Sequence, residues 1–296
     1  MQVAHNKYHH SKSETGWFNM TRKHSKHKHI RQDSMRDPVV WITGASSGIG
    51  EALAKQFAAQ GAQVVLSARR AEQLERVRAQ LLHPEKHLIV PLDVTDYAGL
   101  ADAYAQVLAQ TGRVDCLINN AGVSQRALIC DTTDETDRKL MEIDYFAPVA
   151  LTRLVLPQML KQGSGHVVFI SSVAGLLGTQ YRASYAAAKG AIHLWANSLR
   201  AELADQGLRV SVIFPGFVKT NVSVAALTGG GTALGSMDEA QANAMTADAF
   251  AKQAVEALQA GRDYIVIGGL KEKAGVWLSR LAPTLMYKMI RKSKVR

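Results

Sequence analysis

The sequence predicts an α/β fold in which a doubly wound parallel sheet of seven strands carries helices on both faces. The first observation is an alternation along most of the chain, where short apolar runs are separated by stretches of helical composition, roughly 10–15 residues each. Such alternation is typical of a parallel sheet. The second is the start of the pattern, where the apolar run Val39–Ile42 enters a glycine-rich turn that leads into a helix. Strand, glycine turn and helix in this order indicate a single Rossmann domain.

Seven apolar runs of strand length supply the sheet, and they are Val39–Ile42, Val64–Ser67, His87–Val90, Val114–Ile118, His166–Ile170, Leu208–Phe214 and Tyr264–Ile267. The segments between them predict helices at Glu51–Gln60, Ala71–Leu82, Tyr97–Gln110, Thr133–Lys161, Arg182–Asp205 and Ala247–Ala260. The fourth helix contains Pro148 and Pro157, so we expect a kink or a break in it. Because ligands collect at the carboxyl ends of parallel strands, Asp93, Asn119 and Gly122 are expected at a binding site.

The two ends of the chain differ in composition from its centre. The net charge is +10, and residues 1–36 hold eight Lys or Arg against two Asp or Glu, so the remainder is only mildly basic and nucleic-acid binding is not indicated. We expect residues 1–36 to be a disordered, His-rich leader, because they lack the apolar stretch of a secretory signal and cannot bury a core. Residues 37–270 form the predicted Rossmann domain. Residues 271–296 form a basic amphipathic tail that could lie on an anionic membrane, on the body of the protein or on another subunit.

Hydrophobic residues make up 47% of the chain, which is enough for a sizeable core. No apolar run is long enough to predict a membrane-spanning helix. The two cysteines, Cys116 and Cys130, lie in apolar segments and are expected in the core. Two cysteines supply neither a disulfide framework nor a metal site, so no metal is predicted. A reducing, cytoplasmic compartment fits this usage.

The glycine-rich turn and the next strand end carry the first functional signal. Within Thr43–Gly50, glycines let the backbone approach a pyrophosphate, which would lie at the positive N-terminus of the following helix. After the second strand, Arg69 and Arg70 stand where an acidic residue would hold a ribose 2′-hydroxyl, and an arginine there accommodates a 2′-phosphate. We therefore expect NADP(H) rather than NAD(H). The alternative is that both arginines are solvated charges at the start of a helix.

A second signal lies in the alanine-rich helix that contains Tyr185 and Lys189. Four residues separate them, so both side chains lie on one helix face. A fixed ammonium favours the phenolate over the neutral phenol, which suits a group that passes a proton to and from a carbonyl or alcohol oxygen. The same short pattern also occurs on ordinary solvated helices, which is the alternative interpretation.

A third signal is the stretch from Asn221 to Met245, where the periodic pattern weakens and glycines accumulate. A long glycine-containing loop above the cofactor edge of the sheet predicts a substrate lid. A surface insertion is the alternative. Its apolar members indicate an apolar substrate, and they are Val222, Val224, Ala225, Ala226, Leu227 and Met237.

Taken in order, these motifs resemble the short-chain dehydrogenase/reductase family over about Pro38–Ile267. They are Thr43-Gly44-x-x-x-Gly48-Ile49-Gly50, Asp93-Val94, Asn119-Asn120-Ala121-Gly122, Ser172, Tyr185-x-x-x-Lys189 and Pro215-Gly216-x-x-x-Thr220. Each is weak alone, whereas their occurrence in order at the expected strand ends is specific. Met141–Thr152 and Leu281–Pro283 further resemble the branch of dehydrogenase/reductase members 7 and 7B.

The resemblance implies a role for each matching residue. Ser172 would hold the substrate oxygen, Tyr185 would be the general acid and base, and Lys189 would bind the nicotinamide ribose. Hydride would pass directly between C4 of the nicotinamide and the carbonyl carbon. The cofactor would be bound by Gly44, Ser46, Ser47, Gly48, Ile49, Gly50, Arg69, Asp93, Val94, Asn119, Ala121, Gly122, Tyr185, Lys189, Pro215, Gly216, Val218 and Thr220.

One position departs from the family pattern. The family usually has an asparagine on the helix before the fifth strand, where it helps to hold a water that relays protons, and this chain has Asp144. An ionised Asp only accepts hydrogen bonds. It could still hold the water, or its charge could pair with Lys189 and change the proton transfer. We therefore include Asp144 among the candidate catalytic residues.

The sequence thus predicts an oxidoreductase that transfers hydride between NADP(H) and an apolar carbonyl or alcohol. The alternatives are a non-catalytic dinucleotide-sensing protein on the same fold and a binding protein that acts at a membrane surface. The presence of Ser172, Tyr185 and Lys189 favours the enzyme. By resemblance we expect a homodimer or homotetramer that pairs through Thr133–Lys161 and Arg182–Asp205. We expect a cytoplasmic location, with peripheral membrane contact through the tail.

Overall fold

The computed structural model describes residues 37–236 and 243–291. The predicted leader, residues 1–36, lies outside the described residues, as do residues 237–242 and the last five residues of the tail. All described residues belong to one compact unit, Met35–Arg296.

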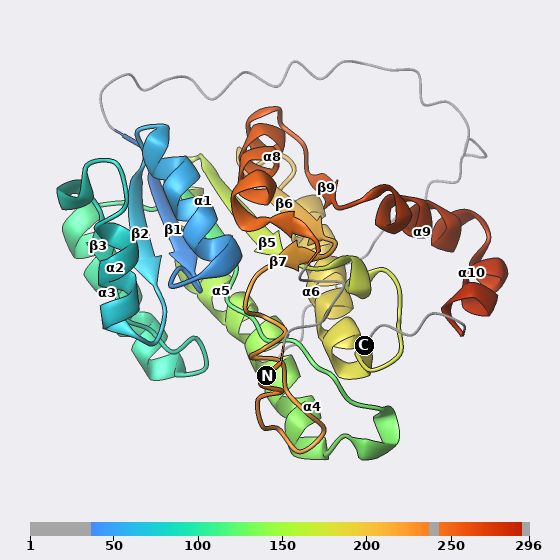
Figure 1. The fold of residues 1–296 in the computed structure, drawn as a ribbon. Helices are drawn as coiled ribbons and strands as arrows, with labels where there is room; N and C mark the ends of the chain where they lie inside the picture. The colour runs from blue at the N-terminus through green and yellow to red at the C-terminus, as the bar shows by residue number, and fades with distance from the viewer. Residues whose placement is uncertain (1–36, 237–242, 292–296) are drawn as a thin grey trace, which may run out of the picture. The chain divides into compact units, whose positions relative to one another are not determined.

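Seven parallel strands of the described chain form one sheet in the order β3-β2-β1-β4-β5-β6-β9, which confirms the predicted α/β architecture (Figure 1). Its strands are β1 (Val39–Thr43), β2 (Gln63–Ser67), β3 (Leu88–Ile89), β4 (Cys116–Asn119), β5 (Gly165–Ile170), β6 (Leu208–Pro215) and β9 (Tyr264–Ile267). The order reverses between β1 and β4, since β1 pairs with β2 on one side and with β4 on the other. Such a reversal leaves a crevice at the carboxyl ends of the strands.

Helices pack on both faces of this sheet and bury a separate core on each. One core joins the sheet to α1 (Gly48–Ala59), α2 (Ala71–Arg78) and α8 (Ala247–Gln259). The other joins it to α3 (Tyr97–Thr111), α5 (Ala147–Gln162) and α6 (Ala183–Glu202). The central strands are buried on both sides, and for this reason they read as continuous apolar runs.

The long helix expected at 133–161 is divided, but not at a proline. The structure has α4 (Asp134–Met141), a π-helical turn (Glu142–Phe146) and then α5. Pro148 lies in the first turn of α5, where its missing N–H costs little, and Pro157 is accommodated inside that helix. The π turn holds Asp144, whose side chain is buried.

The predicted lid is closed at its base by a small sheet that the sequence did not predict. In it β7 (Val218–Lys219) pairs with β8 (Met245–Thr246) in parallel. This pairing joins the two ends of the segment that carries the expected apolar residues. The segment is therefore anchored to the domain at both ends.

One of the two cysteines does not lie where the sequence suggested. Cys116 is buried in β4, whereas Cys130 is exposed. Cys130 belongs to a short 3₁₀ helix (Ile129–Asp131) that buries none of its residues. The apolar neighbours that suggested a core position include Ile129, which is itself 78% exposed.

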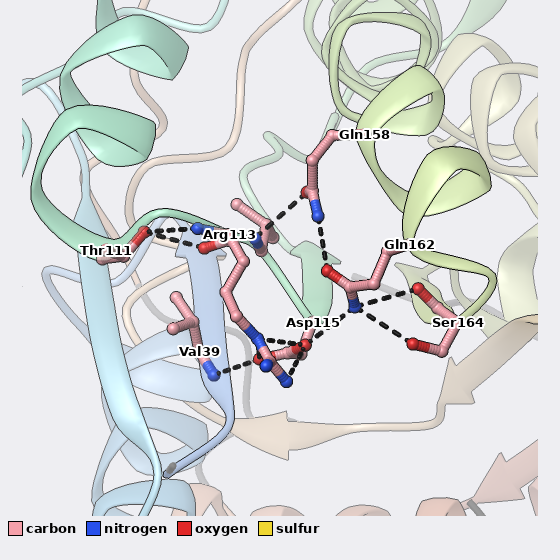
Figure 2. A network of polar contacts seen from close by, with 8 residues as sticks. Val39, Thr111, Arg113, Asp115, Gln158, Gln162 and Ser164 are labelled. Atoms are coloured by element: carbon pink, nitrogen blue, oxygen red, sulfur yellow. Dashed lines mark hydrogen bonds and ion pairs between the residues drawn. The ribbon is translucent and has the colours of Figure 1, made fainter. Parts of the chain in front are cut away.

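A polar network lies at the amino ends of the central strands (Figure 2). The Asp115 carboxylate accepts hydrogen bonds from the Val39 backbone N–H at 2.8 Å, from the Arg113 guanidinium at 2.8 Å and from the Gln162 amide at 3.0 Å. Gln158 continues the network, because its amide oxygen accepts from the Val114 N–H and its nitrogen donates to Gln162. The network joins β1, the start of β4 and the end of α5.

The tail forms two helices that follow the edge strand β9, at the opposite end of the sheet from β3 (Figure 1). They are α9 (Leu270–Leu281) and α10 (Pro283–Ile290). Val276 is buried and Met286 packs against the core, so the tail touches the body with one side. Its other apolar side chains are largely exposed, and they include Leu270, Trp277, Leu281, Leu285, Tyr287 and Met289. Among the described helices none is both long and apolar enough to cross a membrane.

Candidate active site

A cleft of about 1020 Å³ lies along the carboxyl ends of the strands and brings most of the predicted site residues together. Its lining includes Gly44, Ser46, Ser47, Gly48, Ile49, Arg69, Asp93, Val94, Ala121, Gly122, Ser172, Tyr185, Lys189, Pro215, Gly216, Val218 and Thr220. These residues come from segments far apart in the sequence.

Three predicted residues lie behind the lining instead. A Cβ on Gly50 would be 2.2 Å from the Gly44 carbonyl oxygen, so Gly50 allows α1 to pack against the glycine turn. The Asn119 amide is buried and donates to the Thr152 hydroxyl at 3.1 Å. Asp144 contacts Lys189 from behind. Gly50 and Asp144 therefore act on the cleft through Gly44 and Lys189, which line it, whereas the Asn119 bond joins the end of β4 to α5.

The glycine turn is held in place by the end of β4. Asn120 donates from its side-chain amide to the carbonyl oxygens of Thr43 at 2.9 Å and Gly44 at 3.2 Å. The Thr43 hydroxyl in turn accepts from the backbone N–H groups of Asn120 and Ala121. Gly44 has φ +66°, and a Cβ there would be 2.8 Å from Ala121 Cα. The turn needs glycine for both reasons, and it presents the N-terminus of α1 to the cleft.

Guanidinium groups gather at one end of the cleft. Arg69 and Arg70 line it as predicted, and so do Gln73 and Arg76, which sequence reasoning missed. Residues 70, 73 and 76 are three apart, so the helical periodicity of α2 could have identified them. Arg76 donates to the Ser46 carbonyl at 3.3 Å and pairs with Glu51 at 3.1 Å, which places it beside the glycine turn.

Asp93 lies at the same end of the cleft. Partial burial would by itself raise the pKa of Asp93, but hydrogen bonds from Thr95 and the charge of Arg69 outweigh it and lower that pKa. Its carboxylate accepts from the Thr95 backbone N–H at 3.0 Å and from the hydroxyl at 2.7 Å. Asp93 is thus an ionised, locally satisfied carboxylate.

At the other end of the cleft, α6 presents Tyr185 and Lys189 one turn apart. Lys189 Nζ lies 5.9 Å from the centroid of the Tyr185 ring and donates to the Ile170 carbonyl at 3.1 Å. The Ser171 hydroxyl donates to the Lys189 carbonyl at 2.8 Å, which ties α6 to the end of β5. Ser172 follows at the cleft, where its oxygen accepts from the Ala174 N–H at 3.1 Å. An ammonium, a phenol and a hydroxyl thus share one wall.

Lys189 also forms a buried ion pair with Asp144. The Nζ–Oδ1 distance is 3.3 Å, and the two side chains are 7% and 0% exposed. Oδ1 also accepts from the Val123 N–H at 3.1 Å, whereas Oδ2 has no hydrogen-bond partner among the residues that the structure describes. Burial raises the pKa of Asp144 above its usual value, and the Lys189 charge opposes that rise. A Cβ on Gly122 would be 2.5 Å from Oδ1, so the pair requires glycine at this position.

The wall of the cleft beside Tyr185 is mostly apolar. Of the predicted lid residues, Val222, Val224, Ala225 and Leu227 line it, whereas Ala226 is buried elsewhere and Met237 lies outside the described residues. Sequence reasoning missed further lining residues, among them Val123 after β4, Lys139 on α4, Ile143 in the π turn and Ala233 in the lid.

The arrangement fits a dinucleotide. A cationic end, a glycine turn at a helix N-terminus and a phenol–ammonium wall lie in sequence along one cleft. In the described parts of the chain, no group of three or more His, Cys, Asp or Glu is placed to hold a metal ion.

Comparison with known sequences identifies similar proteins over most of the chain. A family model described as short chain dehydrogenase matches residues 38–229. The fruit fly Drosophila melanogaster "Dehydrogenase/reductase SDR family protein 7-like" is 40% identical over 87% of this chain and 81% of its own length. "Dehydrogenase/reductase SDR family member 7B" of the frog Xenopus tropicalis is 39% identical over 86% and 84%.

Solved structures agree in fold. A short-chain dehydrogenase/reductase of Burkholderia phymatum in complex with NAD superposes with a TM-score of 0.74 at 25% identity, covering 84% of this chain and 95% of its own. A serine dehydrogenase complexed with NADP⁺ gives a TM-score of 0.70 at 26% identity, over 79% and 95%. Among proteins with this fold, one structure therefore contains NAD and another contains NADP⁺.

Proposed function

The chain belongs to the short-chain dehydrogenase/reductase family, and from this premise we propose that it is an NADP(H)-dependent oxidoreductase that interconverts an apolar carbonyl compound and its alcohol. The observation that carries the proposal is the wall of Ser172, Tyr185 and Lys189, which faces the same cleft as the guanidinium cluster. Hydride transfer to or from a nicotinamide dinucleotide is the chemistry of the family. The cofactor preference and the kind of substrate are our proposals.

The bound cofactor supplies or accepts the hydride, and this chain supplies orientation and a proton. In reduction, the Tyr185 hydroxyl donates a proton to the carbonyl oxygen, and in oxidation the Tyr185 oxygen accepts it back. The Ser172 hydroxyl donates a hydrogen bond to the same oxygen. Lys189 holds its charge beside the phenol and would donate to the nicotinamide ribose. The apolar lid residues exclude water from the reacting atoms.

The experiment that tests this function is consumption of NADPH or NADH over a panel of apolar ketones and aldehydes. Turnover with NADPH supports the proposal. Cofactor binding without turnover on any panel member favours the dinucleotide-sensing alternative instead. A purified enzyme that prefers small charged substrates would contradict the proposed substrate class.

Arg69 is expected to carry much of the preference for NADP(H). Its replacement by Ala removes a charged donor from the 2′-phosphate, and such hydrogen bonds are worth about 1.5–3 kcal/mol. We expect kcat/KM for NADPH to fall by roughly 10–100-fold, with little change for NADH. Arg78→Ala is the matched control, because Arg78 lies on α2 but pairs with Glu75 outside the cleft. Equal losses with both cofactors would show that Arg69 does not bind the 2′-phosphate.

Asp144 is expected to set the pH range of the reaction. Its carboxylate offsets the Lys189 charge, so less positive potential acts on the Tyr185 oxygen. In Asp144→Asn we expect the pH of half-maximal alcohol oxidation to move down by about one unit, which corresponds to 1.36 kcal/mol. The measurement is the pH–rate profile of both proteins at saturating cofactor. An unchanged profile would remove Asp144 from the proton-transfer machinery.

For the tail we propose peripheral contact with an anionic membrane surface in the cytoplasm. The exposed apolar side chains of α9 and α10 are flanked by Lys271, Lys273, Arg280, Lys288 and Arg291, with Glu272 as the single acid between 270 and 291. Co-sedimentation with phosphatidylserine vesicles, compared with a chain lacking residues 271–296, tests it. Binding that is independent of these residues would refute the proposal.

We also propose a homo-oligomer that pairs through α5 and α6. Each helix carries one exposed leucine that this pairing would cover, Leu160 at 39% and Leu194 at 66%. Light scattering coupled to gel filtration gives the mass in solution. A monomer at micromolar concentration would contradict this assembly.

A further inference from the structure

Gln125 is a buried polar residue to which the preceding sections assign no role. Its side chain is 0% exposed, although it lies only three residues after Gly122, which lines the cleft. Its amide oxygen accepts hydrogen bonds from the backbone N–H groups of Ser184 at 3.0 Å and Tyr185 at 3.4 Å. Its amide nitrogen donates to the Thr132 hydroxyl at 2.9 Å. Both ends of the side chain are therefore satisfied.

The two N–H groups belong to the first turn of α6. The first four N–H groups of a helix have no acceptor inside the helix and need one from elsewhere. Here the acceptor comes from a residue 60 positions earlier, on the loop after β4. One of the two donors is the N–H of Tyr185 itself, so this bond fixes the backbone from which the phenol extends.

The backbone around Gln125 holds the lid as well. Gln125 forms a parallel bridge with Leu227. The Leu227 N–H donates to the Ser124 carbonyl at 2.8 Å, and the Arg126 N–H donates to the Leu227 carbonyl at 2.8 Å. Leu227 and Tyr185 both line the cleft. The segment Ser124–Arg126 thus contacts the start of α6 through the Gln125 side chain and contacts Leu227 of the lid through its backbone.

We propose that Gln125 is a positioning residue that fixes the Tyr185 phenol relative to the lid wall formed by Leu227. The inference rests on the proposed function of Tyr185 in proton transfer. A displacement of about 1 Å at a reacting group lowers a rate by up to roughly 100-fold. Loosening the first turn of α6 therefore slows the chemical step, while the cofactor's phosphate end, held by the glycine turn, is unaffected.

The test compares Gln125→Met, which keeps the length of the side chain and loses all three hydrogen bonds, with Thr132→Val, which removes the hydroxyl that accepts from the amide nitrogen and leaves the amide oxygen in place. We expect Gln125→Met to lower kcat by about tenfold or more, with the dissociation constant for NADPH within about twofold of the unmodified protein. Hydrogen exchange of the Ser184 and Tyr185 amides is expected to quicken. Thr132→Val is expected to leave both kcat and the exchange of the Ser184 and Tyr185 amides unchanged. Gln125→Glu, which keeps an acceptor oxygen, is expected to restore slow exchange.

Unchanged exchange at Ser184 and Tyr185 in Gln125→Met would overturn the proposal, and so would faster exchange with kcat unchanged. An equal loss of kcat in Thr132→Val would also overturn it, because the helix start would then not be the cause. If the unmodified protein turns over no carbonyl or alcohol, the proposed function fails and the positioning role fails with it. The exchange rates can be measured without any activity. They therefore show separately whether Gln125 holds the first turn of α6.

Discussion

Replacing Tyr185 by Phe is expected to lower kcat by about 10²–10⁴-fold, the usual contribution of a positioned general acid or base. Phe keeps the ring and its contact with Lys189, whose Nζ lies 5.9 Å from the ring centroid, and deletes only the hydroxyl. The affinity for NADPH should stay within about threefold, since no phosphate contact changes. Stopped-flow or steady-state consumption of NADPH gives the first quantity and fluorescence titration gives the second.

The control for this substitution is Tyr287→Phe, which removes the same hydroxyl from a side chain that is 66% exposed on α10. It should leave kcat unchanged. If Tyr185→Phe retains more than about a tenth of the activity, another group must supply the proton. The loss of both turnover and cofactor binding would instead indicate that the phenol organises the site.

Lys189→Met is expected to remove activity and to destabilise the fold by about 3–5 kcal/mol, because it leaves the Asp144 carboxylate buried without its partner. Asp144 would then take up a proton more readily, since burial already raises its pKa. The pKa of an Asp in the unfolded chain is about 3.9. When the pKa in the folded protein is higher than this, the folded protein becomes less stable as the pH rises above the unfolded value. The destabilisation should therefore be larger at pH 8 than at pH 5.

Denaturant unfolding at the two pH values measures this difference. The matched variant is Lys189→Met combined with Asp144→Asn, which has no unpaired charge. We expect the double variant to recover most of the stability and its dependence on pH to flatten, while turnover stays lost. A double variant no more stable than Lys189→Met alone would show that the pair does not govern the stability of this region.

The placement of the site on the sheet could be predicted from local sequence. Buried parallel strands read as apolar runs such as Val39–Ile42, and the structure extends that strand by one residue. Glycines at 44 and 48 were informative because few residues adopt their positive φ. These signals depend on the residues themselves and their immediate neighbours.

From the sequence alone, two roles were open for Asp144, which could hold a water or pair with Lys189. The pairing depends on the π turn at Glu142–Phe146, on the absence of a side chain at Gly122 and on the close packing of α6, none of which has a local pattern. Tertiary packing likewise decided β3, which is shorter than its apolar run. His87, which was expected in this strand, precedes it in the structure, and its ring accepts a hydrogen bond from the Val64 N–H at 3.1 Å.

The hydrogen-bond network around Asp115 lies at the amino ends of the strands, and the cleft lies at their carboxyl ends. β4 alone, with 4 residues, separates the two by about 13 Å. Substitutions more than roughly 7–10 Å apart usually have additive effects on free energy. Substitutions at the network can therefore change the stability of the fold without changing the chemistry at the cleft. Engineering for heat resistance can begin at the network, and the substrate range can evolve at the cleft, without one constraining the other.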